Sequence, residues 1–545
     1  MGAKLDVYTL GGCGGFGMNA TLLAVGGEAI LVDFGAGFPR EPLPGAALVV
    51  PDGAALVERF PRLAAIALTH AHDDHCAALS YLPPAWRSAP VYGPAFALAS
   101  AADRLDDNHV PRPRMIPVAA GERVELGPFG VTFVPATHSV PDSALLAIET
   151  PVGLVVHSGD FKLDPAPRKG PPAPRAQLAE LGRKGVRLLL VDSTGALRPG
   201  RTAAESSVAP ALAETIAGAE GQVFVSTFAS HVHRIEAAIE GAAAAGRKVA
   251  LLGQRMTRST RHALDLGQFD APAGTLVSPE ELQDERPECR VWLAGGCQGE
   301  KNSTFSRLSM ETDQRAEVMR GDTVVLSSSI VPGNEMPVSR MVDRFLRLGA
   351  SVMTAGEHPE LHASGHGSRD ELAELVALTR PEVVVPVHGD RAHLEAMAAL
   401  AEAADPAPRQ VLIIEKGDHL ELGGFGAAVV ERLEIHTLYL DDAGLVLSPQ
   451  VMRERQAIAA AGVALVHVRR TSGGRVPDDA VRIEGFGVPG WETIGPEAAD
   501  AALRAVRLAP PWTPVGELEA DIARRVGNLL RRGGRVRPRV VVVLD

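Results

Sequence analysis

Residues 70–75 read His70-Ala71-His72-Asp73-Asp74-His75, and they follow directly on the apolar run AAIAL at residues 64–68. Four potential metal ligands, three histidines and Asp74, therefore fall within six residues. Imidazole nitrogen and carboxylate oxygen suit zinc, and a tight loop lets alternating side chains point towards two different ions. A solvated loop could hold several histidines by chance, but this spacing at the end of a strand favours a metal site.

Further histidine and aspartate residues follow later apolar runs, as two complete coordination shells would require. His138 ends VTFVPATH, Asp160 ends LVVHSGD and His388 ends VVVPVH. Loops at strand ends are where binding sites are commonly built. Each residue alone would be an ordinary capping or core polar residue, but together they predict that the metal centre has two ions.

The composition is that of a folded chain with several domains. With 545 residues, 46% of them hydrophobic and 22% charged, the chain suggests about three units of roughly 100 to 200 residues. No apolar run approaches the roughly 20 residues of a membrane span, and the first ten residues have a strand-like pattern rather than that of a signal peptide. We therefore expect a cytoplasmic protein without a membrane partner.

The charge and the cysteines narrow the kind of site that the chain can carry. A formal net charge of −12 argues against a broad basic surface for nucleic acid, so any RNA contact must be local. Bound cations would raise the potential inside an acidic cleft. Cys13, Cys76, Cys289 and Cys297 lack paired spacing, which argues against a disulfide framework and against a thiolate zinc site. We expect these cysteines to be reduced and mostly buried.

Changes in pattern along the chain indicate four segments. Residues 4–34 alternate short β-rich runs with glycine clusters, and units of strand, loop and helix follow beyond residue 60. From about residue 204 strands alternate with Ala-rich helices, after a capping box at Thr202 and Glu205. The first pattern returns near residue 356, with a capping box at Ser368 and Glu371. We therefore expect an outer domain at 1–203 and 356–424, an inserted domain at 204–355 and a C-terminal domain at 425–545.

Two other patterns have simpler explanations. Gly12, Gly14 and Gly17 match the dinucleotide-binding pattern G-x-G-x-x-G, but the residues after them are strand-like rather than helical. These glycines are expected to let the backbone pass close to the metal loop. The arginines of RVRPR at 535–539 could touch RNA or a partner subunit, but protection of a strand edge by charge is the favoured interpretation.

Taken together, the motifs resemble those of the ribonuclease J family, in the β-CASP branch of the metallo-β-lactamase fold. The resemblance covers nearly the whole chain and rests on GGCGGFGMNATLL, HAHDDH, THSVPDS, HSGDFKLD, VDSTGALRPG, STFASHVHRI, CQGE, SSSIVPGNE, SGHGS and PVHGD. It implies an α/β fold: an αββα metallo-β-lactamase sandwich, an inserted α/β β-CASP domain and a small C-terminal α/β domain. Asp73 stands where glutamate is common in the family.

The resemblance also implies roles for the motif residues. One zinc ion would take His70, His72 and His138, and the other Asp74, His75 and His388, with Asp160 bridging both. Two such ions lower the pKa of a shared water towards roughly 7. Besides the ligand Asp74, the implied catalytic residues are His366, which would protonate the leaving 3′ oxygen, and Asp192, which would orient it. The alternatives are a histidine at a helix start that contacts only backbone and a strand-end carboxylate without a role.

The implied RNA-binding residues are Ser230, His233, Ser364, His366, Gly367 and Ser368. The last four precede a helix, so their backbone N–H groups could hold a phosphate. Ser230 and His233 resemble positions that contact nucleotide in the family, and an ordinary helix cap is the equal alternative. His231 replaces a polar residue that is usual there, and no role is assigned to it.

The expected function is zinc-dependent hydrolysis of RNA phosphodiester bonds, 5′ to 3′ as an exonuclease and also as an endonuclease, in RNA maturation and mRNA decay. Two Zn²⁺ per chain are expected, with Mn²⁺ or Mg²⁺ as alternatives. The expected partners are single-stranded RNA with a 5′ monophosphate and further copies of the chain in a homodimer or homotetramer. A small-molecule hydrolase of the thioesterase or lactamase type is an alternative, but a second α/β domain over the cleft argues against it. A non-catalytic RNA-binding subunit is a third interpretation, and the intact ligand set argues against that one.

Overall fold

The computed structural model describes residues 3–331, 333–469, 476–510, 512–534 and 537–544. It divides into two compact units, the first formed by Met1–Gly37 and Val50–Thr437, the second by Phe38–Val49 and Leu438–Asp545. None of the described helices is long and apolar enough to cross a membrane.

Two large sheets form the centre of the first unit. The eight-stranded sheet has the order β21-β20-β1-β2-β3-β5-β6-β7, with β1 (Leu5–Gly11), β2 (Ala20–Val25), β3 (Glu28–Val32), β5 (Ala65–Ala67), β6 (Val91–Gly93), β7 (Met115–Pro117), β20 (Asp418–Gly423) and β21 (Gly426–Arg432). The seven-stranded sheet has the order β19-β18-β12-β11-β10-β9-β8, with β8 (Arg123–Leu126), β9 (Phe129–Pro135), β10 (Ala144–Thr150), β11 (Gly153–His157), β12 (Val186–Asp192), β18 (Val383–Val387) and β19 (Gln410–Val411). Their facing side chains share one core, in which Val7 and Ile30 of the first sheet meet Phe133, Leu146 and Val385 of the second.

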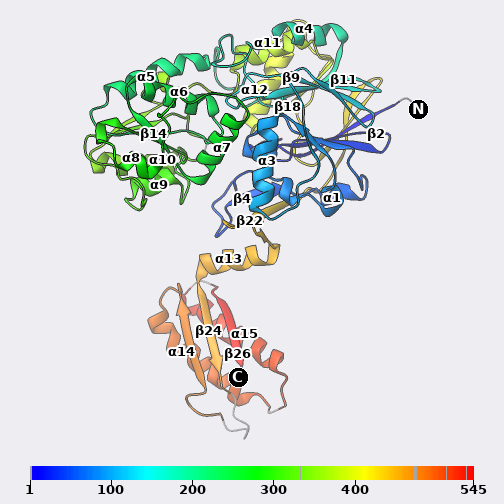
Figure 1. Ribbon diagram of the computed structural model, residues 1–545. Helices are drawn as coiled ribbons and strands as arrows, with labels where there is room; N and C mark the ends of the chain where they lie inside the picture. The colour runs from blue at the N-terminus through cyan, green and yellow to red at the C-terminus, as the bar shows by residue number, and fades with distance from the viewer. Residues whose placement is uncertain (1–2, 332, 470–475, 511, 535–536, 545) are drawn as a thin grey trace. The chain divides into compact units, whose positions relative to one another are not determined.

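Helices cover the outer face of each sheet. On the seven-stranded sheet lie α4 (Arg175–Lys184), α11 (Arg369–Thr379) and α12 (Arg391–Glu402), whose Leu178, Leu375 and Met397 pack against Leu189. Next to β6 and β7 lies α3 (Ala95–Asp107), which buries Phe96. The short helices α1 (Ala54–Val57) and α2 (Asp73–Cys76) complete this part. The layers, helix on sheet on sheet on helix, confirm the expected αββα sandwich (Figure 1).

The inserted domain is a second α/β layer structure within the same unit. Its parallel sheet has the order β14-β15-β13-β16-β17, with β13 (Val223–Ser226), β14 (Lys248–Leu252), β15 (Arg290–Ala294), β16 (Thr323–Leu326) and β17 (Ser351–Thr354). Its helices are α5 (Val208–Gly218), α6 (Val232–Ala244), α7 (Gln254–Asp265), α8 (Pro279–Gln283), α9 (Thr304–Ser309) and α10 (Glu335–Leu348). Phe224, Trp292 and Phe345 form its core.

A fully buried arginine ties together the two places where the chain passes between the outer and inserted domains. Arg234 of α6 donates from Nε and Nη2 to Glu205 Oε1 at 3.1 and 2.9 Å, beside the entering segment. Its Nη1 donates to the Leu361 carbonyl at 3.0 Å, on the returning segment, and to the Ser327 carbonyl at 3.1 Å. One planar guanidinium thus binds both chain segments that connect the two domains, so Arg234 holds these segments together.

One of the two predicted capping boxes is wrong and the other is confirmed. The N-cap of the 3-10 turn at Glu205–Ser207 is Ala204, and the Glu205 carboxylate is used by Arg234 instead. The Thr202 N–H donates to Glu371, whose carboxylate also completes the predicted box with Ser368. The local pattern at Thr202 therefore failed because a buried cation competed for the same carboxylate.

The second unit holds a three-stranded sheet, β25-β24-β26, with β24 (Val463–Val468), β25 (Val481–Phe486) and β26 (Arg539–Leu544). Its helices are α13 (Pro449–Ala461), α14 (Trp491–Leu508) and α15 (Val515–Gly534). A small sheet, β23-β22-β4, stands where the chain passes from one unit to the other and consists of β4 (Leu48–Pro51), β22 (Thr437–Leu440) and β23 (Val446–Leu447). Since β21 belongs to the eight-stranded sheet, the larger part of this unit begins at Leu438 rather than at the expected residue 425, and Phe38–Val49, expected in the outer domain, also belongs to the unit. Arg539 begins the edge strand β26 and pairs with Glu454 at 2.8 Å, whereas Arg535 lies outside the described residues.

The expectations for the glycine cluster and the cysteines agree with the described residues. Gly12, Gly14 and Gly17 are followed by the strand β2, not by a helix. All four cysteines are free, and only Cys289 is partly exposed.

Candidate metal centre

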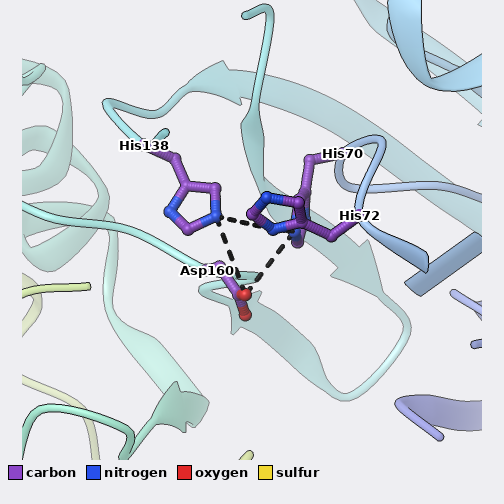
Figure 2. Close-up of side chains that lie close together, drawn as sticks. All are labelled: His70, His72, His138 and Asp160. Carbon is purple, nitrogen blue, oxygen red and sulfur yellow. Dashed lines mark hydrogen bonds and ion pairs between the residues drawn. The ribbon is translucent and has the colours of Figure 1, made fainter. Parts of the chain in front are cut away.

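The residues of HAHDDH, with His138, Asp160 and His388, converge at one edge of the sandwich. They follow β5, β9, β11 and β18, which come from both sheets. Figure 2 shows His70, His72 and His138 arranged around Asp160. Within each of two groups, all candidate ligand atoms lie within 4.8 Å of one another: His70, His72, His138 and Asp160 in the first, and Asp74, His75, Asp160 and His388 in the second.

In the first group, three ring nitrogens face each other. His72 Nδ1 lies 3.1 Å from His70 Nε2 and 3.1 Å from His138 Nε2. A tetrahedron with Zn–N bonds of about 2.05 Å has edges of about 3.3 Å. The spacing therefore fits one small cation between the three nitrogens. Hydrogen bonds among the three rings could not pair all of these nitrogens at once.

Asp160 joins the two groups. Its Oδ1 lies 2.9 Å from His388 Nδ1 and 3.2 Å from His75 Nε2, in the second group. Its Oδ2 lies 3.5 Å from His70 Nε2 and 3.8 Å from His138 Nε2, in the first. One carboxylate oxygen for each group is the arrangement of a bridging ligand, so the donor set fits a metal cofactor.

The protonation of three of the five imidazoles suits metal binding. Burial lowers the pKa of His72 to about 4, and burial together with a neighbouring imidazole lowers the pKa of His70 and His138 well below the ordinary value. These rings are neutral at pH 7, which is the form that binds a metal. Burial opposes protonation of His388 too, but Asp160 and Asp74 raise its pKa to about 10. A cation would displace that proton.

Several residues that hold these side chains were not predicted from the sequence. His75 Nδ1–H donates to Asp33 Oδ2 at 2.7 Å, and Asp33 also accepts the N–H and the hydroxyl of Thr69 at 2.8 Å each. His138 Nδ1–H donates to the Gly365 carbonyl at 2.7 Å, which leaves Nε2 to face the cluster. Asn19 Nδ2 donates to Asp74 Oδ2 at 3.2 Å. Asp33 follows the run EAILV, so the strand-end signal that identified Asp160 applied to it as well.

Close backbone packing fixes the metal loop. A Cβ on Gly35 would lie 1.7 Å from the Asp74 carbonyl oxygen, so only glycine fits there. The Gly12 carbonyl accepts the His388 N–H at 2.6 Å, with Gly12 at φ +77°. The backbone at Gly12 thus packs against the loop that carries His388, in the same cluster of candidate ligands.

A third group lies beside the first two. His366 Nδ1–H donates to Asp192 Oδ2 at 2.7 Å, and His366 Nε2 lies 3.8 Å from Asp160 Oδ2. Asp192 is fully buried, and its Oδ1 accepts the Thr194 N–H at 2.8 Å. The His366 side chain is 19% exposed, so one edge of the ring can meet a substrate.

Comparisons with known proteins give the family of the chain. Models of the ribonuclease J β-CASP domain, the β-lactamase superfamily domain and the Zn-dependent metallo-hydrolase RNA specificity domain match residues 220–345, 29–252 and 359–411. A ribonuclease J of Thermus thermophilus is 34% identical over 99% of this chain and 95% of its own length. A ribonuclease J of Corynebacterium glutamicum is 32% identical over 98% of this chain and 76% of its own length. The chain belongs to the ribonuclease J family.

A solved structure has a fold similar to that of this ribonuclease J family member. It is described as a protein of unknown function from Enterococcus faecalis, with a TM-score of 0.53 and 16% identity, and the match covers 77% of this chain and 100% of that one.

The expected RNA-binding residues of this ribonuclease J family member lie at two helix starts. In SGHGS, the N–H groups of His366, Gly367 and Ser368 donate to Ser364 Oγ, the Phe161 carbonyl and Glu371 Oε2. These three N–H groups are bonded within the protein and are not free for a phosphate, whereas the expected phosphate contact of Ser364 stays a prediction. The Ser368 hydroxyl is also buried beside Thr202 Oγ1, at 2.9 Å.

Ser230 and His233 lie at the start of α6 in the inserted domain, and no described hydrogen bond links them to the metal ligands. Burial lowers the pKa of His233 to about 4. The unassigned His231 is buried, with its Nε2 3.2 Å from Glu205 Oε1.

Proposed function

We propose that the chain is a metal-dependent ribonuclease that hydrolyses phosphodiester bonds of single-stranded RNA. The observation that carries the proposal is Asp160, which gives one oxygen to each of two His/Asp groups and lies 3.8 Å from the partly exposed His366. The relatives are ribonucleases J, and the matched RNA specificity domain contributes the segment that contains His366.

We propose two Zn²⁺ per chain, with Mn²⁺ or Mg²⁺ as alternatives. The first group offers three neutral imidazoles, and the second mixes imidazole with carboxylate, a set that suits zinc better than magnesium. When bound, such ions supply a Lewis acid and an activated water for attack on phosphorus. The protein fixes which ring nitrogen a histidine presents to the metal, as the Gly365 carbonyl does for His138.

We propose that His366 is the acid that protonates the leaving 3′ oxygen. Its Nδ1–H is held by the buried Asp192, so the ring cannot turn freely. The other nitrogen, Nε2, points towards Asp160 and is the atom at which a proton can be carried to the substrate. Asp192 is a positioning residue for this ring.

The direction of cleavage and the assembly are further proposals by analogy with the family. We propose 5′ to 3′ exonuclease action on RNA with a 5′ monophosphate, endonuclease action in addition, and a role in RNA maturation and mRNA decay. Ser230 and His233 on the inserted domain are the proposed nucleotide contacts, and Ser364 is proposed to act through its side chain. We also propose a homodimer or homotetramer, which light scattering of the purified protein would measure.

Cleavage of RNA labelled at its 5′ end tests the activity. The expected product is labelled mononucleotide, lost on chelation and restored by zinc or manganese. His366→Ala should lower kcat by about 10²- to 10⁴-fold, as expected for loss of a general acid, while the zinc content stays unchanged. His109→Ala, at an exposed position away from the described cluster, is the matched control. RNA that stays intact with either metal would refute the proposal, and equal rates for the two variants would refute the role of His366.

The metal content tests the two-ion arrangement separately. Purified protein should contain two zinc ions per chain, and Asp160→Ala should lose both because the shared carboxylate is removed. One ion in the parent protein, or full occupancy in the variant, would contradict a bridging role for Asp160.

A further inference from the structure

Two ion pairs and one hydrogen bond between a histidine and a carboxylate join the inserted domain to the outer domain next to the metal centre. On α7, Arg255, Arg258 and His262 are spaced i, i+3 and i+7, which places them on one face of the helix. They meet Asp73 at 3.1 Å, Asp107 at 2.7 Å and Asp103 at 2.9 Å. The last two acids are one turn apart on α3.

The pair Arg255–Asp73 differs from the other two contacts because Asp73 belongs to the metal loop. It is the first residue of α2 and stands between the proposed ligands His72 and Asp74. Its carbonyl accepts the Ala36 N–H at 2.9 Å, so its backbone is fixed against the loop that follows β3.

The carboxylate of Asp73 is shared between the two domains. Arg104, on α3 of the outer domain, donates to it from Nε at 3.2 Å and from Nη2 at 2.6 Å. Arg255, on the inserted domain, adds the third donor. A shift of the inserted domain would therefore act directly on a residue that is covalently bonded to two metal-ligand residues.

We propose that Arg255 is a positioning residue that couples the docking of the inserted domain to the geometry of the metal loop. Arg258 and His262 hold α7 on α3 without touching the loop. The role in RNA cleavage rests on the proposed function, but the coupling itself concerns only the two domains and the bound metal.

Arg258→Gln is the matched control for Arg255→Gln. Each variant removes one ion pair of the same helix, made through Nη1 alone, and both pairs are partly exposed, so each should weaken docking to a similar small degree. Only Arg255→Gln removes a donor from the metal loop.

The experiment measures zinc affinity by competition with a coloured chelator, and the visible absorption spectrum of the Co²⁺ form, which reports ligand geometry. We expect Arg255→Gln to weaken zinc binding about two- to five-fold, the range of a partly exposed ion pair, and to change the Co²⁺ spectrum. Arg258→Gln should leave both measurements as in the parent protein, and Arg255→Lys should restore them in part. Equal behaviour of the two Gln variants, or parent-like zinc binding and spectrum in Arg255→Gln, would overturn the proposal.

A small phosphodiester, bis(p-nitrophenyl) phosphate, separates this result from the proposed function. Its turnover requires the metal centre but not RNA binding, and kcat should fall in Arg255→Gln alone. A protein that cleaves no RNA would refute the ribonuclease proposal while the zinc affinities still decide the role of Arg255.

Discussion

Replacement of Asp33 by Asn tests how the fold selects which nitrogen of His75 would bind the proposed metal ion. The Asp33 carboxylate accepts three hydrogen bonds, from the Thr69 N–H, the Thr69 hydroxyl and His75 Nδ1–H. A carboxylate offers only acceptors, whereas Asn brings an NH₂ group that must face one of these donors. If it faces His75, the proton of that ring moves to Nε2, which lies 3.2 Å from Asp160 Oδ1. A protonated Nε2 cannot bind a metal.

The expected cost follows from the position of Asp33 behind the proposed ligand His75. Loss of such a supporting carboxylate typically weakens metal binding about 10- to 100-fold, or roughly 1.4 to 2.8 kcal/mol. Asp322→Asn is the matched control, because Asp322 is a buried carboxylate of the inserted domain that accepts the N–H groups of Gln222 and Met319 at 2.9 and 2.8 Å. Both variants leave a buried donor without its acceptor, so each should lose about 1 to 3 kcal/mol of stability.

Zinc affinity, measured by competition with a chelator, separates the two variants, and thermal denaturation of the metal-free proteins checks that their folding losses match. Only Asp33→Asn should bind zinc more weakly. If its zinc affinity equals that of Asp322→Asn, Asp33 supports the fold alone and does not select the tautomer of His75.

Three further substitutions have defined outcomes. Gly35→Ala places a Cβ 1.7 Å from the Asp74 carbonyl oxygen, so the metal loop must move, and the purified protein should lose zinc; full zinc content would show that the loop can adjust. Burial lowers the pKa of His231 to about 4, so the folded ring stays neutral while the unfolded ring takes up a proton below about pH 6.5. The free energy of unfolding should therefore fall as pH drops from about 6.5 to 4, by about 1.4 kcal/mol per pH unit for this group. In His231→Gln, urea titrations at several pH values should show a weaker dependence of this free energy on pH. An unchanged dependence would show that other groups cause it. Arg234→Met should cost about 3 to 5 kcal/mol of stability because it leaves the buried Glu205 carboxylate without its cation. The control Arg344→Met, at an exposed position, should change the melting temperature little. Similar losses in both variants would contradict the role of Arg234 between the two domains.

Local patterns predicted the strands and the clustering of candidate ligands at their ends, whereas the αββα arrangement was implied by the resemblance. Runs such as VVVPV are buried along their whole length, and the polar residue that follows each run marks the edge of a sheet. His138, Asp160 and His388 could be placed in this way although they are far apart in the chain. Their assignment to two groups needed the resemblance, since no spacing shows which strand ends are neighbours.

The supporting contacts could not be predicted in the same way. The Gly365 carbonyl that holds His138 has no signature, since every residue carries one. The pair Arg255–Asp73 joins two domains, and nothing within either segment indicates its partner. The capping box at Thr202 failed for the related reason that Glu205 meets Arg234, a distant residue whose burial outweighs the local preference. Local patterns place side chains at an edge, whereas tertiary contacts decide what each one does there.

The acidic charge of the chain and a polyanionic substrate are compatible because the relevant charge is that of the site. The net charge of −12 is spread over the whole sequence, whereas Asp74, Asp160 and Asp192 are the only carboxylates in the three groups of candidate ligands among the described residues. Two divalent cations would outweigh these three negative charges, since burial keeps His70, His72 and His138 neutral. Because α7 of the inserted domain contacts the metal loop through Arg255 and Asp73, the contacts that hold the two domains together, at Arg234 and along α7, bear on this loop as well as on stability.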